Sequence, residues 1–180
     1  MVAGLNRAPF EPGAAWDLTS RGTVVATDGL SDHVIELSGA GDPIGALPLP
    51  GGRRAVPPDE RADSAAALQA RVDSLPVPLD DVDGLSPLIR EGTLPDSFPS
   101  TTSLHVALDD KAWVGRWPLA DRPPHKVYDV LGPGGYERTV VVPAPLLDDP
   151  PPYVSHGLVV GVVVDPATEV QSVLVFRVRK

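Results

Sequence analysis

Residues that could carry catalytic chemistry are few in this sequence, and their spacing does not favour a catalytic site. No two of the four histidines have the i, i+4 spacing of a metal-binding pair on one helix, so each is interpreted as a strand or turn residue. Ser155 directly precedes His156, but neighbours on a strand point to opposite faces of a sheet, a poor geometry for a nucleophile and its base. The histidines are His33, His105, His125 and His156.

Three pairs of adjacent aspartates offer the oxygen ligands that calcium prefers: Asp80-Asp81, Asp109-Asp110 and Asp148-Asp149. The stretch from Asp80 to Asp83 lacks the regular Asp-x-Asp-x-Asp-Gly spacing of a calcium loop. Aspartate also accepts hydrogen bonds from nearby backbone N–H groups in turns. Turn formation is therefore the favoured interpretation, calcium binding is the alternative, and no other cofactor is expected.

A glycine-rich stretch and a tryptophan cluster complete the candidates. Gly132 to Gly135 lacks the Lys and Ser/Thr of a phosphate-binding loop and lies between two predicted strands, so it predicts a hairpin turn. Trp113, Arg116 and Trp117 combine the residue types that dominate binding hot spots. On a strand, alternation places the two tryptophans on one face and the arginine on the other, which favours packing between sheets for the tryptophans. The predicted ligand-binding residues are Trp113, Arg116, Trp117 and His156, with no catalytic or metal-binding residue assigned.

The composition limits the classes of function. With 24 acidic and 15 basic residues the net charge is -9, which repels nucleic acid and anionic membrane surfaces. The absence of cysteine excludes disulfides, thiolate metal sites and cysteine nucleophiles. No apolar run reaches the ~20 residues of a membrane helix, and the first ten residues hold no apolar signal-peptide segment. We therefore expect a soluble protein that does not bind nucleic acid and does not span a membrane.

Short strands separated by turn residues recur along the chain. A first unit at 14–50 and a second at 103–145 each contain four predicted strands, and a third at 153–180 contains three. An insertion at 51–102 lies between the first two units. There Ala65, Leu68, Val72 and Leu75 have the spacing of one buried face of an amphipathic helix ended by Pro76, and four prolines between Val77 and Ser100 favour an extended loop.

Repeated four-strand meanders of about 40 residues are typical of propeller blades, which cover their apolar faces by stacking on one another. The sequence therefore predicts an all-β fold, a partial β-propeller of about three four-stranded antiparallel blades with one helical insertion. The third unit lacks a fourth strand, and closed propellers commonly supply such a strand from the other end of the chain. Because the first predicted strand begins soon after Met1, we also expect upstream sequence to be missing.

The order of these features resembles the six-bladed β-propeller proteins that are widespread in bacteria, often secreted or lipid-anchored and of unassigned function. The segments that carry the resemblance are Pro9-Phe10, Trp16 to Thr27, His33 to Leu37, Leu94 to Pro99, Ala112 to Pro118 and Lys126 to Val130. The resemblance implies that the chain corresponds to a C-terminal half of about three blades. It also implies an extracytoplasmic location, and pairing of two chains as one way to complete a ring.

Three functional hypotheses follow. The first is a non-enzymatic propeller that binds a small molecule, a glycan or a protein through its loops. The second is a calcium-dependent hydrolase or lactonase of the six-bladed type, with acidic loop residues as ligands. The third is a structural fragment that associates with itself, as a homodimer for example, through its exposed edge strands.

Overall fold

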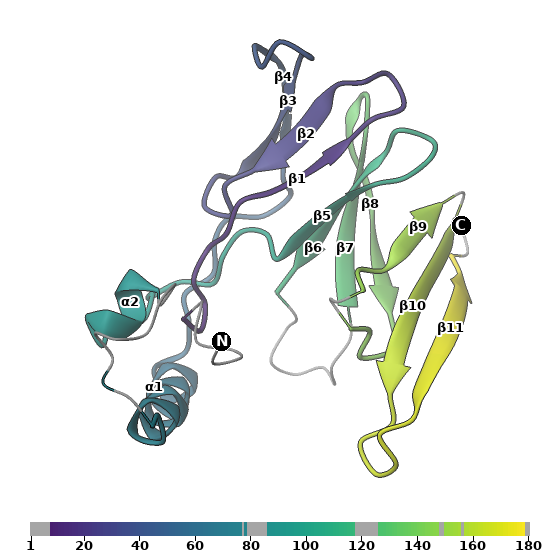
Figure 1. The fold of residues 1–180 in the computed structure, drawn as a ribbon. Coiled ribbons are helices and arrows are strands. Elements are labelled where there is room, and N and C mark those ends of the chain that lie inside the picture. The colour runs from purple at the N-terminus through teal and green to yellow at the C-terminus, as the bar shows by residue number, and fades with distance from the viewer. Residues whose placement is uncertain are drawn as a thin grey trace. The chain divides into compact units, whose positions relative to one another are not determined.

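The computed structural model describes residues 8–76, 78, 86–117, 126–147, 150–155 and 157–178. These residues form two compact units, one of residues 1–12 and 53–99 and one of residues 13–52 and 100–180. The second unit contains three antiparallel sheets with four, four and three strands, and the first contains two helices (Figure 1). The prediction of a mainly β fold is confirmed at this level. None of the described helices is long and apolar enough to cross a membrane.

Each sheet is a meander in which strands that follow one another in the sequence are neighbours. The first sheet contains β1 (Ala15–Leu18), β2 (Val24–Thr27), β3 (His33–Leu37) and β4 (Pro43–Pro48). The second contains β5 (Ser103–Val106), β6 (Ala112–Arg116), β7 (Lys126–Gly132) and β8 (Gly135–Val142). The third contains β9 (Tyr153–Ser155), β10 (Leu158–Val164) and β11 (Gln171–Arg177), with β11 and β9 at its edges. The predicted strand order is therefore confirmed in all three sheets.

Three of the hairpins use one turn geometry. In the β1–β2 turn, the Thr19 N–H donates to the Thr23 carbonyl, and the Gly22 N–H donates to the Thr19 carbonyl. The β3–β4 and β5–β6 turns, which begin at Ser38 and Ala107, have the same two hydrogen bonds. The fourth residue of each turn has a positive φ, which costs glycine little because it has no side chain. Gly22 and Gly41 have this conformation in the first sheet, whereas Asp110 has it in the second, at φ 58°.

The core lies between the sheets. One cluster joins the inner face of the first sheet to one face of the second, and it contains Val25, Val34, Leu104, Val114 and Leu131. A second cluster joins the opposite face of the second sheet to the third, through Trp113, Tyr128, Val130, Val154 and Val159. The second sheet is thus covered on both faces, while the first and third sheets each use one face in these clusters.

The inserted unit differs from the prediction in two details. The predicted amphipathic helix is present as α1 (Pro58–Asp73), but none of its residues is buried and Ala65 is exposed. Leu68 and Val72 are half-buried and line a groove of about 480 Å³ together with Ile89 and Leu94. The predicted extended loop is wrong at α2 (Pro87–Arg90), a single turn that Ser86 caps by accepting a hydrogen bond from the Leu88 N–H. A proline at the first helical position, which we interpreted as a helix breaker, here starts the turn.

Candidate functional site

The sequence-predicted binding residues do not lie together on one surface. Trp113 is 2% exposed and packs in the core between the second and third sheets, with its ring 6.0 Å from that of Tyr128. Arg116 lies on the opposite face of β6, the face toward the first sheet, because side chains alternate along the strand. Trp117 follows β6 and is half-buried, and His156 lies outside the described residues. Trp113 and Arg116 therefore lie on opposite faces of β6 and do not form one recognition site.

Arg116 belongs to a polar network on the second sheet. Its Nη1 lies 3.4 Å from Oδ2 of Asp129, whose side chain is 6% exposed, and the other carboxylate oxygen accepts a 2.6 Å hydrogen bond from the Thr139 hydroxyl. Thr139 in turn contacts the Tyr136 hydroxyl at 3.0 Å. A buried carboxylate requires a charged partner and hydrogen bonds, and Asp129 has both. We therefore assign this network to holding β6, β7 and β8 in register.

The remaining candidates are the histidines and the pairs of aspartates. The part of the chain that the structure describes holds no group of three or more His, Asp or Glu side chains that could bind a metal ion. His33 contacts the neighbouring Asp32 at 3.2 Å, and His105 packs against Tyr128 at 6.3 Å between ring centres. Of the candidates weighed, the pairs Asp80-Asp81 and Asp148-Asp149 and the residue His125 lie outside the described residues. Of the three acidic pairs, only Asp109-Asp110 can be placed.

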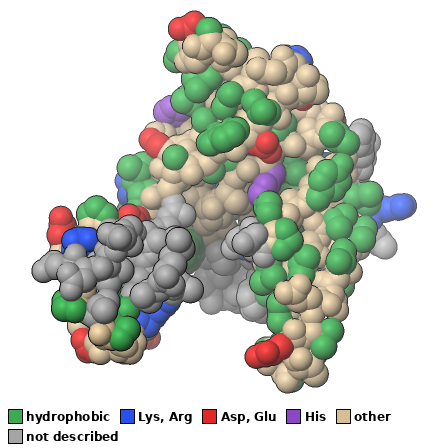
Figure 2. Space-filling view, viewed as in Figure 1, with side chains coloured by type: hydrophobic (Ala, Val, Ile, Leu, Met, Phe, Trp, Pro, Cys, Tyr) green, Lys and Arg blue, Asp and Glu red, His purple; other side chains and the backbone are tan. Residues whose placement is uncertain are grey.

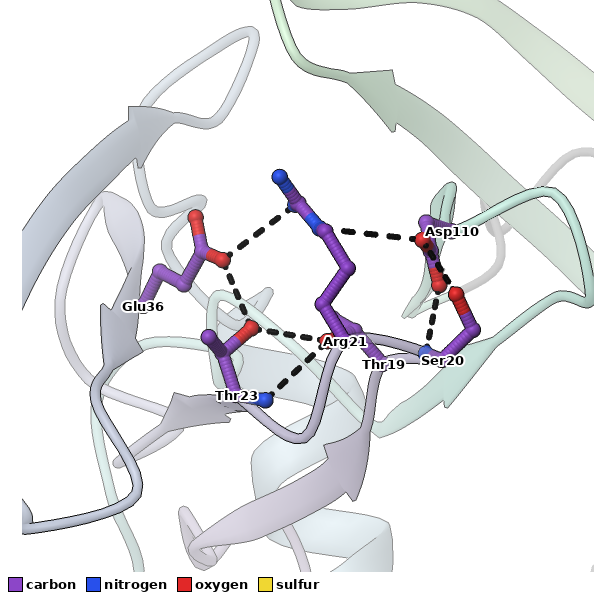
Figure 3. Close-up of polar contacts among 6 residues, drawn as sticks. All are labelled: Thr19, Ser20, Arg21, Thr23, Glu36 and Asp110. Carbon is purple, nitrogen blue, oxygen red and sulfur yellow. Dashed lines mark hydrogen bonds and ion pairs between the residues drawn. The ribbon is translucent and has the colours of Figure 1, made fainter.

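Asp110 forms a contact between sheets that the sequence did not indicate (Figure 3). Its carboxylate accepts hydrogen bonds from the Ser20 backbone N–H at 2.6 Å and from the Ser20 hydroxyl at 2.7 Å, across a separation of 90 residues. Arg21 lies between Asp110 and Glu36, at 3.7 Å and 3.4 Å from their oxygens. The Asp17 carboxylate makes a second contact of this kind by accepting from the Val106 N–H at 2.7 Å. Two carboxylates thus join the first and second sheets beside their hairpin turns.

The contact explains why aspartate stands where the other two turns have glycine. A side chain in the left-handed region is strained, although aspartate and asparagine tolerate it better than most residues. At Asp110 the strain is offset by two charge-assisted hydrogen bonds and a nearby guanidinium, none of which a glycine could form. We interpret Asp110 as a structural link between the sheets.

The charge of Asp110 should make the link sensitive to acid. The backbone and side-chain hydrogen bonds from Ser20, with the Arg21 charge, hold the pKa of Asp110 below its ordinary value of 3.8. A lowered folded-state pKa stabilises the protein above the unfolded-state pKa, and this stabilisation is lost as pH falls through the folded-state value. Asp110→Asn keeps the turn conformation and removes the charge, so it should lower the free energy of unfolding by a constant amount above pH ~5.

Urea unfolding of the wild type and of Asp110→Asn, measured from pH 7 to pH 2.5, tests this link. The difference between the two proteins should shrink below pH ~4, where the wild-type carboxylate also becomes neutral. Asp28 and Asp165, whose pKa values are also lowered by backbone hydrogen bonds, titrate in both proteins and cancel in the difference. A difference that does not change with pH would show that the Asp110 charge has no part in joining the sheets.

The outer face of the first sheet is apolar and uncovered. Because Val25, Val34 and Leu47 point into the core, alternation places their strand neighbours on the opposite face. Trp16 and Leu18 on that face are 66% and 55% exposed. We call this surface the N-terminal end face, and it consists of Trp16, Leu18, Val24, Ala26, Ile35, Leu37, Ile44 and Ala46. None of these side chains is charged, and His33, at the start of β3, shares the face with them.

The outer face of the third sheet has the same character. Val154, Val159 and Phe176 point toward the second sheet, so the intervening residues form the opposite face. Val173 and Val175 are 67% and 63% exposed there. We call this surface the C-terminal end face, and it consists of Tyr153, Val160, Val162, Val173 and Val175, which are paired across the three strands. Arg177, at the end of β11, lies on the same face. Figure 2 shows hydrophobic side chains gathered over this sheet.

Sequence reasoning did not identify the two end faces. Strand alternation predicts which residues share a face, but only the packing shows which face is covered. Exposed apolar patches of more than a few hundred Å² are uncommon on monomers and mark interaction sites. Comparison of the chain with protein-family models, with curated proteins and with solved structures gave no match.

Proposed function

We propose that this chain is a non-enzymatic interaction module, part of a β-propeller, that assembles with a second copy of itself through its two end faces. The observation that carries the proposal is the exposure of a largely apolar sheet face at each end of the series of sheets. A sheet that is apolar on both faces normally has both faces covered, as the second sheet has here.

The arrangement of strands supports the propeller part of the proposal. In a propeller, consecutive meander sheets stack face to face around an axis that the first strand of each sheet lines. Here β1 lies against β5 and β5 against β9, so the first strands of the three sheets adjoin one another. The resemblance to six-bladed propellers agrees with this arrangement, since two such chains would supply about six blades.

The order of the sheets supports a second copy as the partner. Each sheet packs on the one that follows it in the sequence, so the C-terminal end face is the surface for a following sheet and the N-terminal end face is the surface for a preceding one. Four strands about 4.8 Å apart, with about five residues of about 3.3 Å each, give a face of about 300 Å². Two such contacts would bury at least ~500 Å² per copy, which approaches the ~800 Å² of a standard stable interface.

Sedimentation velocity over a range of concentrations tests the proposal. We expect the wild type to associate, and Trp16→Glu and Val173→Glu each to raise the dissociation constant about thirtyfold or more, because each places a charge in a desolvated apolar contact. Leu108→Glu is the matched control, since Leu108 is 65% exposed but lies in the β5–β6 turn and on neither end face.

Two outcomes would contradict the proposal. A wild type that stays monomeric at the highest concentration would remove the second copy as the partner. Equal weakening by Leu108→Glu and by the two end-face variants would show that association depends on general surface hydrophobicity. No observation on the described residues favours the calcium-dependent hydrolase, and the proposal assigns no ion or catalytic residue.

A further inference from the structure

The third sheet has one strand fewer than the other two, and a groove lies beside its open edge. No described strand pairs with the outer side of β11, so alternate N–H and C=O groups of β11 point outward there. The groove has a volume of about 360 Å³ and is lined by residues 138–143 of β8 and its end and by residues 176–178 at the end of β11. It therefore lies where a fourth strand of this sheet would run.

The walls of the groove are apolar with two cationic groups. Val140 and Val142 are buried members of the core, whereas Phe176 and Val178 pack at its margin and are only half-buried. Arg138 and Arg177 also line the groove. A side chain placed here would cover the half-buried residues and lie near Arg138, which is on the same face of β8 as Val140 and Val142.

Arg138 is the unusual residue of the groove. Its Nε atom is buried and has no hydrogen-bond partner among the described residues. An unsatisfied buried donor on a charged group is costly, and native proteins normally satisfy it. A carboxylate is the acceptor that matches a guanidinium in both charge and geometry.

We infer that β11 and this groove form a binding site for an extended, acidic peptide segment of another protein, which adds to the third sheet as its fourth strand. Backbone hydrogen bonds to the β11 edge would supply affinity, apolar side chains would cover Phe176 and Val178, and one carboxylate would accept from Arg138. Strand addition with side-chain pockets for specificity is a general mode of peptide recognition. The recognition contacts of the site, Arg138, Phe176 and Val178, lie on the side of the third sheet opposite the C-terminal end face, so the inference does not depend on self-association.

The probe is a blocked, fluorescein-labelled peptide of alternating threonine and valine with one central glutamate, equal in length to the 8 residues of β8. Anisotropy measurements should show that it binds at least about tenfold more tightly than the same peptide with glutamine, because an ion-paired hydrogen bond is lost. Arg138→Gln should remove this preference, and Arg138→Lys should restore part of it. Lys111→Gln is the matched control, since Lys111 pairs with Glu137 outside the groove.

Two backbone readouts distinguish strand addition from simple charge attraction. Two peptides, one N-methylated at its odd-numbered residues and one at its even-numbered residues, should behave differently. One should lose binding and the other should bind as before, because only one set of amides faces β11. Hydrogen exchange should slow at β11 amides in Gln171–Arg177 and not at the β9 edge. Equal binding of both methylated peptides, equal binding of the glutamate and glutamine peptides, or no binding at millimolar peptide would each overturn the inference.

Discussion

Trp113→Ala should lower the free energy of unfolding by about 3–5 kcal/mol, the largest single effect we expect from a side-chain truncation in this protein. The indole is 2% exposed and fills the space between the second and third sheets beside Tyr128, Val130 and Val159. Its removal costs the transfer free energy of the ring and leaves a cavity that a sheet interface cannot easily close. Since domains are stable by only ~5–15 kcal/mol, much of the stability would be lost.

Trp16 provides a control of the same residue type. It is 66% exposed on the N-terminal end face, so Trp16→Ala should change the unfolding free energy of the monomer by no more than ~0.5 kcal/mol. Both variants should be unfolded with urea at a protein concentration below the association range, with far-ultraviolet circular dichroism as the signal. Similar losses for the two variants would contradict the division into core and end face.

Disulfide trapping should show directly which faces meet. The chain has no cysteine, so single cysteines can be introduced without background. Ala26 lies in the N-terminal end face between Trp16 and Ile35, and Val162 lies in the C-terminal end face opposite Val173. We expect a mixture of Ala26→Cys and Val162→Cys to form a covalent dimer under mild oxidation, and the doubly substituted chain to form a dimer closed by two disulfides.

Each single variant alone should cross-link poorly, because a contact between unlike faces keeps identical residues apart. Ala40→Cys, at an exposed position in the β3–β4 turn, measures cross-linking by random collision. Efficient cross-linking of Ala26→Cys with itself would mean that like faces meet and would contradict the ring arrangement. A ladder of higher oligomers from the double variant would indicate an open series of copies instead of a closed pair.

The strands of this fold could be predicted because each is short, alternates in polarity and ends at a recognisable turn. Asp28-Gly29, Ser38 to Asp42 and Gly132 to Gly135 all separate the strands that the sequence assigned to them. The short helix α2 was missed because a single turn provides no periodicity to detect. The burial of the apolar face of α1 was overestimated, because alanine at helical spacing fits an apolar pattern even where its side chain stays exposed.

The functional surfaces were harder to predict, for a physical reason. Trp16 and Trp113 are each the second residue of a short strand, so their local sequence patterns are alike. Only the packing of whole sheets makes Trp16 exposed and Trp113 buried. The link between Asp110 and Ser20 joins residues far apart in the sequence, and a turn aspartate without an obvious partner has no distinguishing local signal. The sequence predicted only three strands in the third unit, but the groove beside β11 depends on how the second and third sheets pack, which a local pattern of residues does not show.

The meander order of the strands also bears on how the chain folds. Every strand pairs with its sequence neighbour, so the pairings within each sheet are local and the contact order of each sheet is low, which favours rapid formation. Contacts between the first and second sheets require the insertion between β4 and β5 to close as a loop, whereas contacts between the second and third sheets do not. Doubling the length of such a loop costs only ~0.6 kcal/mol, so this position can accommodate large additions to the chain while the sheets keep their order.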